Sequence, residues 1–191
     1  MSAQGAGAPS PQVSSTGRGR PGSWRTAIAL GSNLGDRLGN LRTARAAVLA
    51  LAGITPPILS SPIYETEPVD TAPDAGAFLN AVIEVGCALP PRALLAALQD
   101  IERQMGRPSP HPRNAPRRID LDILYCGDLV LAEAGVELPH PRLHLRRFVL
   151  TPLADIRPDL ILPGRRRSVA ALLAGLHDPA GVKLSGLTWD R

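Results

Sequence analysis

Residues 117–125 read Arg-Arg-Ile-Asp-Leu-Asp-Ile-Leu-Tyr, and this stretch is the most informative part of the chain for both fold and chemistry. Its apolar and polar residues alternate with the period of a β-strand, which leaves one face apolar. Asp120 and Asp122 lie on the other face, roughly 6–7 Å apart along the strand. Both carboxylates can reach the same one or two hard cations, and oxygen ligands of this kind suit Mg²⁺.

The segment that leads into this strand is strongly basic. Between Arg103 and Arg118 there are five arginines and one histidine, but no acidic residue. A basic loop followed by a metal-binding strand suits a nucleotide polyphosphate, because arginine presents a planar, permanently charged fork of donors. Paired aspartates also occur on the solvent face of ordinary edge strands, so the pair alone leaves a purely structural explanation open.

The composition limits the class of protein. The 191 residues suffice for one domain with a substantial core, and 44% are hydrophobic, as in ordinary globular proteins. No apolar run approaches the roughly 18 residues that span a membrane. The first 25 residues lack the apolar stretch of a secretory signal. We therefore expect a cytoplasmic protein that does not bind membranes.

Charge and cysteine content add two expectations. The formal charge is +4 with 21 basic residues, nearly all arginine. A GC-rich coding bias explains that excess as well as phosphate binding does, so the position of each arginine matters more than the total. Cys87 and Cys126 fall in apolar, strand-like segments, which predicts buried free thiols in a reducing compartment.

Hydrophobic periodicity predicts an alternating order of strands and helices. Residues 1–23 are rich in Ser, Gly, Pro, Ala and Arg, which predicts a disordered tail before a single domain over 24–191. The predicted strands cover 24–30, 58–66, 77–89 and the Asp120–Asp122 segment, and the predicted helices cover 38–53, 90–105, 148–156 and 168–176. A small hairpin is expected over 129–138. The order β-α-β-β-α-β predicts an α+β, ferredoxin-like fold: a mostly antiparallel sheet with helices packed on one face, plus short C-terminal helices.

Six short motifs occur in the order found in a known family. They are Ala29–Gly35, Ser61–Thr66, Phe78–Ala81, Gly106–Arg107, Ala115–Leu124 and Leu138–Pro141. On these motifs the chain resembles the 6-hydroxymethyl-7,8-dihydropterin pyrophosphokinase family over about residues 24–165. The Pro-Arg-x-x-Asp-x-Asp-Ile block, which begins at Pro116, is the most specific of them.

The resemblance implies a reaction and its substrates. The family transfers the β,γ-pyrophosphoryl group of ATP to the hydroxymethyl oxygen of the reduced pterin, and AMP is the other product. We therefore expect an enzyme of folate biosynthesis that uses ATP as co-substrate and two Mg²⁺ ions. We also expect a monomer that does not bind nucleic acid. The residues agree with this chemistry, because phosphoryl-type transfers depend mainly on positioning and charge neutralisation.

The resemblance also implies roles for individual residues. Asp120 and Asp122 become the metal ligands, and they form the catalytic set together with the loop arginines Arg107 and Arg117. The expected ATP-binding residues are Gln99, Glu102, Ile123, His140 and Arg146. The expected pterin-binding residues are Thr66, Val69, Phe78, Asn80 and Phe148. Two phenylalanines suit a flat bicyclic ring, since offset stacking adds roughly 0.5–1.5 kcal/mol to area burial; core packing is the alternative for both.

Some positions depart from the family pattern. Asn114 stands where many members have tryptophan, Ser109 where some have a further arginine, and Glu67 where proline is usual. These changes bear on loop closure rather than on the reaction class. We expect the loops over 67–76 and 107–116 to close over bound ATP and exclude water.

Three other classes remain open on the sequence alone. The turn over Gly31–Asp36 joins a strand to a helix, as the phosphate-binding loop of a P-loop kinase does. The Lys-Ser/Thr pair of such a loop is missing here. A nucleic-acid-binding module shares the element order. A regulatory ligand-binding domain needs no chemistry. The last two have no use for Asp120 and Asp122, which would repel phosphates in the absence of a metal.

Overall fold

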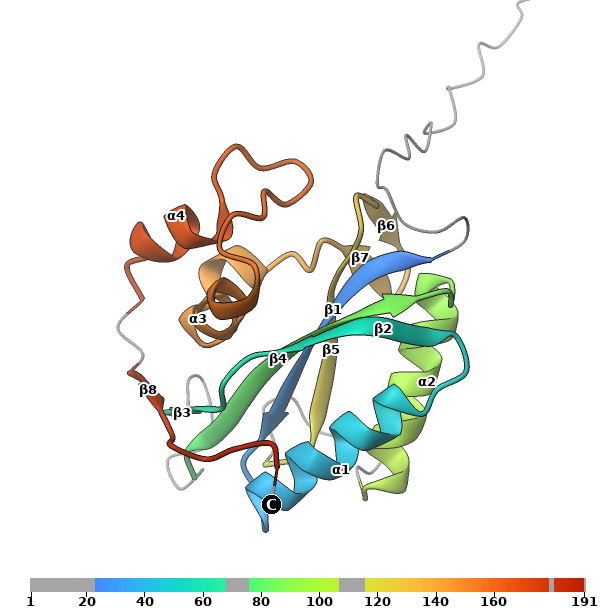
Figure 1. Ribbon diagram of the computed structural model, residues 1–191, viewed down its shortest axis with the longest axis vertical. Helices are drawn as coiled ribbons and strands as arrows, with labels where there is room; N and C mark the ends of the chain where they lie inside the picture. Colours follow the sequence, from blue (N-terminus) through green and yellow to red (C-terminus); the bar gives the residue numbers. More distant parts are fainter. Residues whose placement is uncertain (1–22, 68–75, 107–115, 179–180, 191) are drawn as a thin grey trace, which may run out of the picture.

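The computed structural model describes residues 23–67, 76–106, 116–178 and 181–190 (Figure 1). The strands are β1 (Trp24–Ser32), β2 (Ile54–Ser60), β3 (Tyr64–Thr66), β4 (Phe78–Cys87), β5 (Asp120–Cys126), β6 (Leu131–Glu133), β7 (Val136–Leu138) and β8 (Val182–Leu184). The helices are α1 (Arg37–Leu49), α2 (Pro91–Gln104), α3 (Arg147–Ile156) and α4 (Val169–Ala174), with a 3-10 turn, η1, at Leu143–Leu145. Within the described ranges, no helix is long and apolar enough to cross a bilayer.

The main sheet is antiparallel throughout and has helices on both faces. Its strands lie in the order β5-β1-β4-β3-β8, and β2 pairs with β4 next to β3. Helices α1 and α2 cover one face, and α3 and α4 cover the opposite face (Figure 1). This confirms the predicted α+β, ferredoxin-like class. The expectation of helices on one face holds for α1 and α2, while the C-terminal helices add a third layer.

Local sequence explains the main elements. Strand β4 is the central strand, so nine of its ten residues are buried, as its continuous apolar run predicts. Helix α1 begins at a cap in which the Asp36 carboxylate accepts the Gly39 N–H at 2.9 Å. Helix α2 begins with Pro91 in its first turn, where a missing N–H costs nothing. Cys87 and Cys126 are buried and unbridged, as expected.

Several boundaries differ from the sequence predictions. The single strand expected over 58–66 is two strands, β2 and β3, because Ser61 and Pro62 interrupt the ladder. The Ser61 side chain accepts the Val82 N–H at 3.0 Å, and Pro62 has no N–H to donate. Strand β8 was not predicted from the sequence. The predicted tail, and most of both predicted loops, lie outside the described residues.

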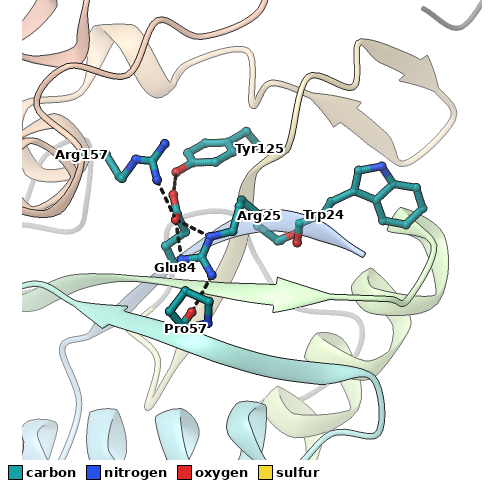
Figure 2. Close-up of polar contacts among 7 residues, drawn as sticks. Trp24, Arg25, Pro57, Glu84, Tyr125 and Arg157 are labelled. Atoms are coloured by element: carbon teal, nitrogen blue, oxygen red, sulfur yellow. Dashed lines mark hydrogen bonds and ion pairs between the residues drawn. The ribbon is translucent and has the colours of Figure 1, made fainter. Parts of the chain in front are cut away.

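A buried carboxylate ties α3 to the sheet (Figure 2). Glu84 on β4 is fully buried and binds Arg25 of β1, with 2.7 Å from Nε and 2.5 Å from Nη2 to Oε1. Arg157, which follows α3, donates to the same oxygen at 3.2 Å. The Tyr125 hydroxyl of β5 donates to the other oxygen. Burial, and then the charge of Glu84, raises the pKa of Tyr125, so this hydroxyl stays a neutral donor. Three strands and the end of α3 therefore meet at one side chain.

Candidate active site

A cavity of about 280 Å³ lies between the main sheet and the start of α3. It is lined by residues near the ends of β1, β3, β4 and β5 and by the segment from η1 into α3. Nine residues that the sequence singled out line it together: Thr66, Phe78, Asn80, Arg117, Asp120, Asp122, His140, Arg146 and Phe148. The structure thus brings the two acids, the cationic side chains and the two phenyl rings into one space.

Gly31 forms the floor of this cavity. In the strand register it is paired with Asn80 on β4 and with Asp120 on β5. A Cβ at Gly31 would lie 3.0 Å from the Asn80 Oδ1, 3.8 Å from a ring carbon of Phe78 and 3.9 Å from the Asp120 Cβ. The sequence predicted a turn here, but Gly31 lies within β1. Its missing side chain leaves room for a ligand against the row formed by Asn80, Gly31 and Asp120.

Each acid of β5 lies beside an arginine. Arg117 Nη1 is 3.0 Å from the Asp120 carboxylate, and Arg146 Nη1 is 4.0 Å from the Asp122 carboxylate. The Asp120 and Asp122 side chains are 30% and 43% exposed, so both carboxylates reach the cavity rather than the core. An arrangement of alternating acid and guanidinium groups can hold a cation and a polyanion side by side.

Two side chains fix the start of β5. The Asn33 Oδ1 accepts the Arg117 N–H at 2.8 Å, and the Asn33 N–H donates to the Arg117 carbonyl at 3.2 Å. On the α2 side, Glu102 is 6% exposed and accepts the Leu121 N–H at 2.7 Å. The Gly-Ser-Asn turn therefore holds the segment that carries Arg117. Glu102 holds the strand between its two aspartates from the opposite face.

The aromatic end of the cavity contains a polar pair. The Asn80 Nδ2 donates to the Thr66 Oγ1 at 2.7 Å, and both side chains are buried. Phe78 and Phe148 line the same space. The Arg146 guanidinium lies over the Phe148 ring at 5.4 Å from its centroid, so the cationic and aromatic parts of the cavity meet at these two side chains.

His140 is neutral at physiological pH. Burial, followed by the positive charges of Arg146 and Arg142, lowers its pKa to about 4. The His140 Nδ1 accepts the Arg142 N–H at 3.2 Å, so in the neutral ring the proton resides on Nε2. An anionic ligand in the cavity would receive a hydrogen bond from Nε2 and would favour protonation of the ring.

The pKa of His140 leads to a pH dependence of stability. Because the folded pKa lies below the unfolded value of about 6.5, the unfolded chain binds a proton that the folded chain refuses as pH falls from about 6.5 to about 4. The free energy of unfolding therefore decreases over this pH range, and above about pH 6.5 His140 has no such effect. When the pH is lowered from about 7 to about 5, the free energy of unfolding should fall in both proteins. We expect the fall to be about 1 kcal/mol smaller in His140→Asn than in wild type, allowing for the partial exposure of His140. Urea unfolding of both proteins checks this; parallel curves would contradict it.

The remaining predicted residues lie elsewhere. Ile123 lines a neighbouring hollow of about 350 Å³ that shares Asp122 and His140 with the cavity. Gln99 is exposed on α2 and lines neither hollow, and Glu102 is buried beneath β5. Two predicted residues, Arg107 and Val69, lie outside the described residues, as do Ser109 and Asn114.

The sequence predictions missed some residues of the cavity. Glu67 and Arg142 line it, as does Gly31. Arg142 follows the Leu138–Pro141 motif by one residue, so the run of basic side chains from His140 to Arg147 was a usable signal. Gly31 belongs to the Ala29–Gly35 motif, but its position beside Asn80 and Asp120 depends on two strands distant in sequence.

Comparison with known proteins shows the family of the chain. The family described as 7,8-dihydro-6-hydroxymethylpterin-pyrophosphokinase matches residues 27–158. The 2-amino-4-hydroxy-6-hydroxymethyldihydropteridine pyrophosphokinase of Bacillus subtilis is 44% identical over 129 residues, covering 68% of this chain and 75% of that protein. The Pseudomonas aeruginosa protein of the same name is 39% identical over 150 residues, covering 78% of this chain and 91% of that protein.

Other relatives are much longer than this chain. The folic acid synthesis protein fol1 of Pneumocystis carinii is 38% identical over 79% of this chain, which spans 20% of that protein. The crystal structure of wild-type Plasmodium falciparum HPPK-DHPS has a TM-score of 0.62 at 13% identity, over 80% of this chain and 44% of that one, which supports the fold. The chain therefore belongs to the 7,8-dihydro-6-hydroxymethylpterin-pyrophosphokinase family and is an ATP-dependent diphosphotransferase of folate biosynthesis.

Proposed function

We propose that the cavity holds 6-hydroxymethyl-7,8-dihydropterin against the triphosphate of ATP, so that the pterin hydroxymethyl oxygen attacks the β-phosphorus and AMP leaves. One observation carries this proposal: two neighbouring aspartates of β5, three arginines, a neutral histidine and two phenyl rings line a single cavity. A nucleic-acid surface or a purely regulatory pocket does not need that combination. The Gly31–Asp36 turn, held through Asn33 to Arg117, supports the structural explanation of that turn over a phosphate-binding loop.

Asp120 and Asp122 fit a magnesium site of the kind that uses few protein ligands. Within the described residues, no group of three or more His, Cys, Asp or Glu side chains gathers as a metal-binding set. Mg²⁺ commonly takes one or two carboxylates and completes its shell with phosphate oxygens and water. When bound, Mg²⁺ would neutralise charge on the phosphate oxygens and favour loss of the hydroxyl proton. Two such ions are part of the proposal.

Arg117 and Arg146 supply the positive charge of the chain itself. Each lies beside an aspartate, so each can exchange that carboxylate for a phosphate oxygen once a cation takes the carboxylate. Arg142 and the Nε2–H of His140 add donors on the same wall. These groups hold the triphosphate in line with the pterin, and holding the reactants together accounts for most of the rate enhancement expected in such transfers.

The pterin and the adenine of ATP would bind in different hollows. Phe78 and Phe148 would cover the faces of the pterin, and the Asn80 Oδ1 would accept from its polar edge while Nδ2 remains bound to Thr66. The neighbouring hollow, where Leu95, Ile123 and Leu138 supply apolar side chains, would take the adenine. Because it shares Asp122 and His140 with the cavity, a triphosphate running between the two hollows passes both acids.

The decisive experiment measures the leaving group. Purified protein with ATP, Mg²⁺ and 6-hydroxymethyl-7,8-dihydropterin should release AMP, and omission of either the pterin or the metal should stop the release. A control with guanosine in place of the pterin should give no AMP. Formation of ADP as the pterin-dependent product would overturn the proposal.

Gly31→Ala should weaken pterin binding selectively. The added methyl would lie 3.0 Å from the Asn80 Oδ1, so Asn80 must move by a few tenths of an ångström on the side that faces the pterin. We expect the KM for pterin to rise about tenfold, equivalent to about 1.4 kcal/mol, and the KM for ATP to stay within about twofold. Steady-state kinetics with each substrate varied in turn checks this. Equal increases in both KM values would contradict the assignment of this floor to the pterin.

A further inference from the structure

The last ten described residues form a strap along the edge of the sheet. Its first part contains β8, which pairs with β3 so that Val182 lies opposite Thr66 and Leu184 opposite Tyr64. From there the chain runs back to α1 (Figure 1). The strap begins at residue 181, whereas the family match ends at residue 158. The reaction assigned above makes no use of it.

Trp189 anchors the strap. Its indole N–H donates to the Ser61 carbonyl at 2.7 Å, in the break between β2 and β3. The Arg45 guanidinium of α1 lies over its ring, 5.3 Å from the centroid. Arg42, also on α1, donates to the carbonyls of Thr188 at 2.9 Å and Asp190 at 2.5 Å. Because both the ring and the N–H of Trp189 make contacts, this side chain holds the strap in one register along β3.

The strap reaches the cavity through β3. This strand is only three residues long and ends at Thr66, which binds Asn80 at the pterin end of the cavity. Beyond its end, the Glu67 N–H donates to the Gly181 carbonyl at 3.4 Å, and Glu67 lines the cavity. In the antiparallel register Thr66, Phe78 and Val182 project from the same face of the sheet. The strap therefore lies directly beside the residues expected to hold the pterin.

Short strands without a second partner open easily. On one side β3 pairs with β4, and the Tyr64 hydroxyl donates to Asp155 of α3 at 2.7 Å. Without β8, its other side would be an exposed edge, and local opening of three-residue edges costs little free energy. Opening would move Thr66 away from Asn80 and change the polar edge offered to the pterin.

We propose that residues 181–190, anchored by Trp189, are a positioning element of the pterin subsite: they hold β3 so that Thr66 and Asn80 keep one arrangement toward the substrate. This inference rests on the proposed function for the identity of the ligand. Trp189 itself touches no substrate and acts through β3. The strap lies far from Asp122 in the fold's strand order, so the ATP half of the site is independent of it.

The test compares Trp189→Ala with two further variants. Trp189→Phe keeps a ring over Arg45 but loses the hydrogen bond to Ser61, and Leu184→Ala removes an exposed side chain of the strap as a matched control. For Trp189→Ala we expect the KM for pterin to rise about tenfold, and the KM for ATP to stay within about twofold. Trp189→Phe should be intermediate, and Leu184→Ala should match wild type. Equal changes for both substrates, or no change for pterin, would overturn the proposal.

Hydrogen exchange gives a readout that does not depend on catalysis. In Trp189→Ala, the amides of Thr66 and Glu67 should exchange at least tenfold faster, while those of β5 keep the wild-type rate. Unchanged exchange in β3 would overturn the proposal even if kinetics were altered. If Trp189→Ala fails to fold, Arg42→Gln loosens the same anchor and takes its place. Absence of AMP release in wild type would count against the proposed function, and the exchange data would still decide on the strap.

Discussion

Asp122→Ala is expected to lower the rate of AMP release by about a thousandfold, or ~4 kcal/mol of transition-state stabilisation, with little loss of stability. The physical reason is that the carboxylate lines the cavity, is 43% exposed and lies 4.0 Å from Arg146, so removing it deletes the proposed cation ligand rather than a core contact. Asp122→Asn tests the charge alone, because the amide keeps the volume of the side chain but loses its negative charge. We expect it to lower activity nearly as much as Asp122→Ala does.

The measurement is kcat at saturating ATP, Mg²⁺ and reduced pterin, together with the thermal midpoint of each variant. Asp128→Ala, an exposed aspartate just beyond the same strand, is the matched control and should keep wild-type activity. Retention of more than a tenth of wild-type kcat in Asp122→Asn would show that the negative charge is dispensable. It would thereby remove the metal-ligand role proposed for this side chain.

Glu84→Ala should be the most destabilising single substitution among those considered. It would leave the Tyr125 hydroxyl buried without its acceptor and the guanidinium groups of Arg25 and Arg157 without their common partner (Figure 2). Breaking a buried ion pair costs about 3–5 kcal/mol, and partial exposure of both arginines places our expectation near the lower end, at about 3 kcal/mol.

Urea unfolding at neutral pH measures this loss. Tyr125→Phe removes one hydrogen bond and keeps the ion pairs, so it should cost only about 1–2 kcal/mol and serves as the graded comparison. A loss below about 1 kcal/mol for Glu84→Ala would mean that the cluster is electrostatically neutral in net effect, as buried pairs are in some proteins.

Local patterns were sufficient to predict the main elements and most of the cavity. The alternation through Asp120 and Asp122 predicted β5 and the orientation of both carboxylates. The apolar face of residues 90–105 predicted α2. Family motifs then selected residues that the structure places around one cavity, although they lie on different elements. Such predictions succeed because the strand and helix periods are local properties of the chain.

The sequence did not predict features that depend on residues distant along the chain. Strand β8 is three residues long and has no pattern of its own; it exists because β3 offers an unpaired edge. Glu84 interrupts an apolar strand and has no visible partner in the sequence, since its arginines come from β1 and from the end of α3. Glu102 accepts the Leu121 N–H of β5, a contact that the sequence did not indicate, and its expected place beside ATP stays a prediction. Each case requires knowledge of tertiary contacts.

The direction of β1 has a practical consequence for immobilising or tagging the enzyme. Trp24, at its start, is paired with Cys87, whereas Gly31, at the other end, is paired with Asn80. Seven residues of extended chain separate these pairs by about 23 Å. A surface tether attached at Ser23 would therefore lie about one strand length from the row of Asn80, Gly31 and Asp120, and it would leave diffusion of the pterin into that part of the cavity unobstructed.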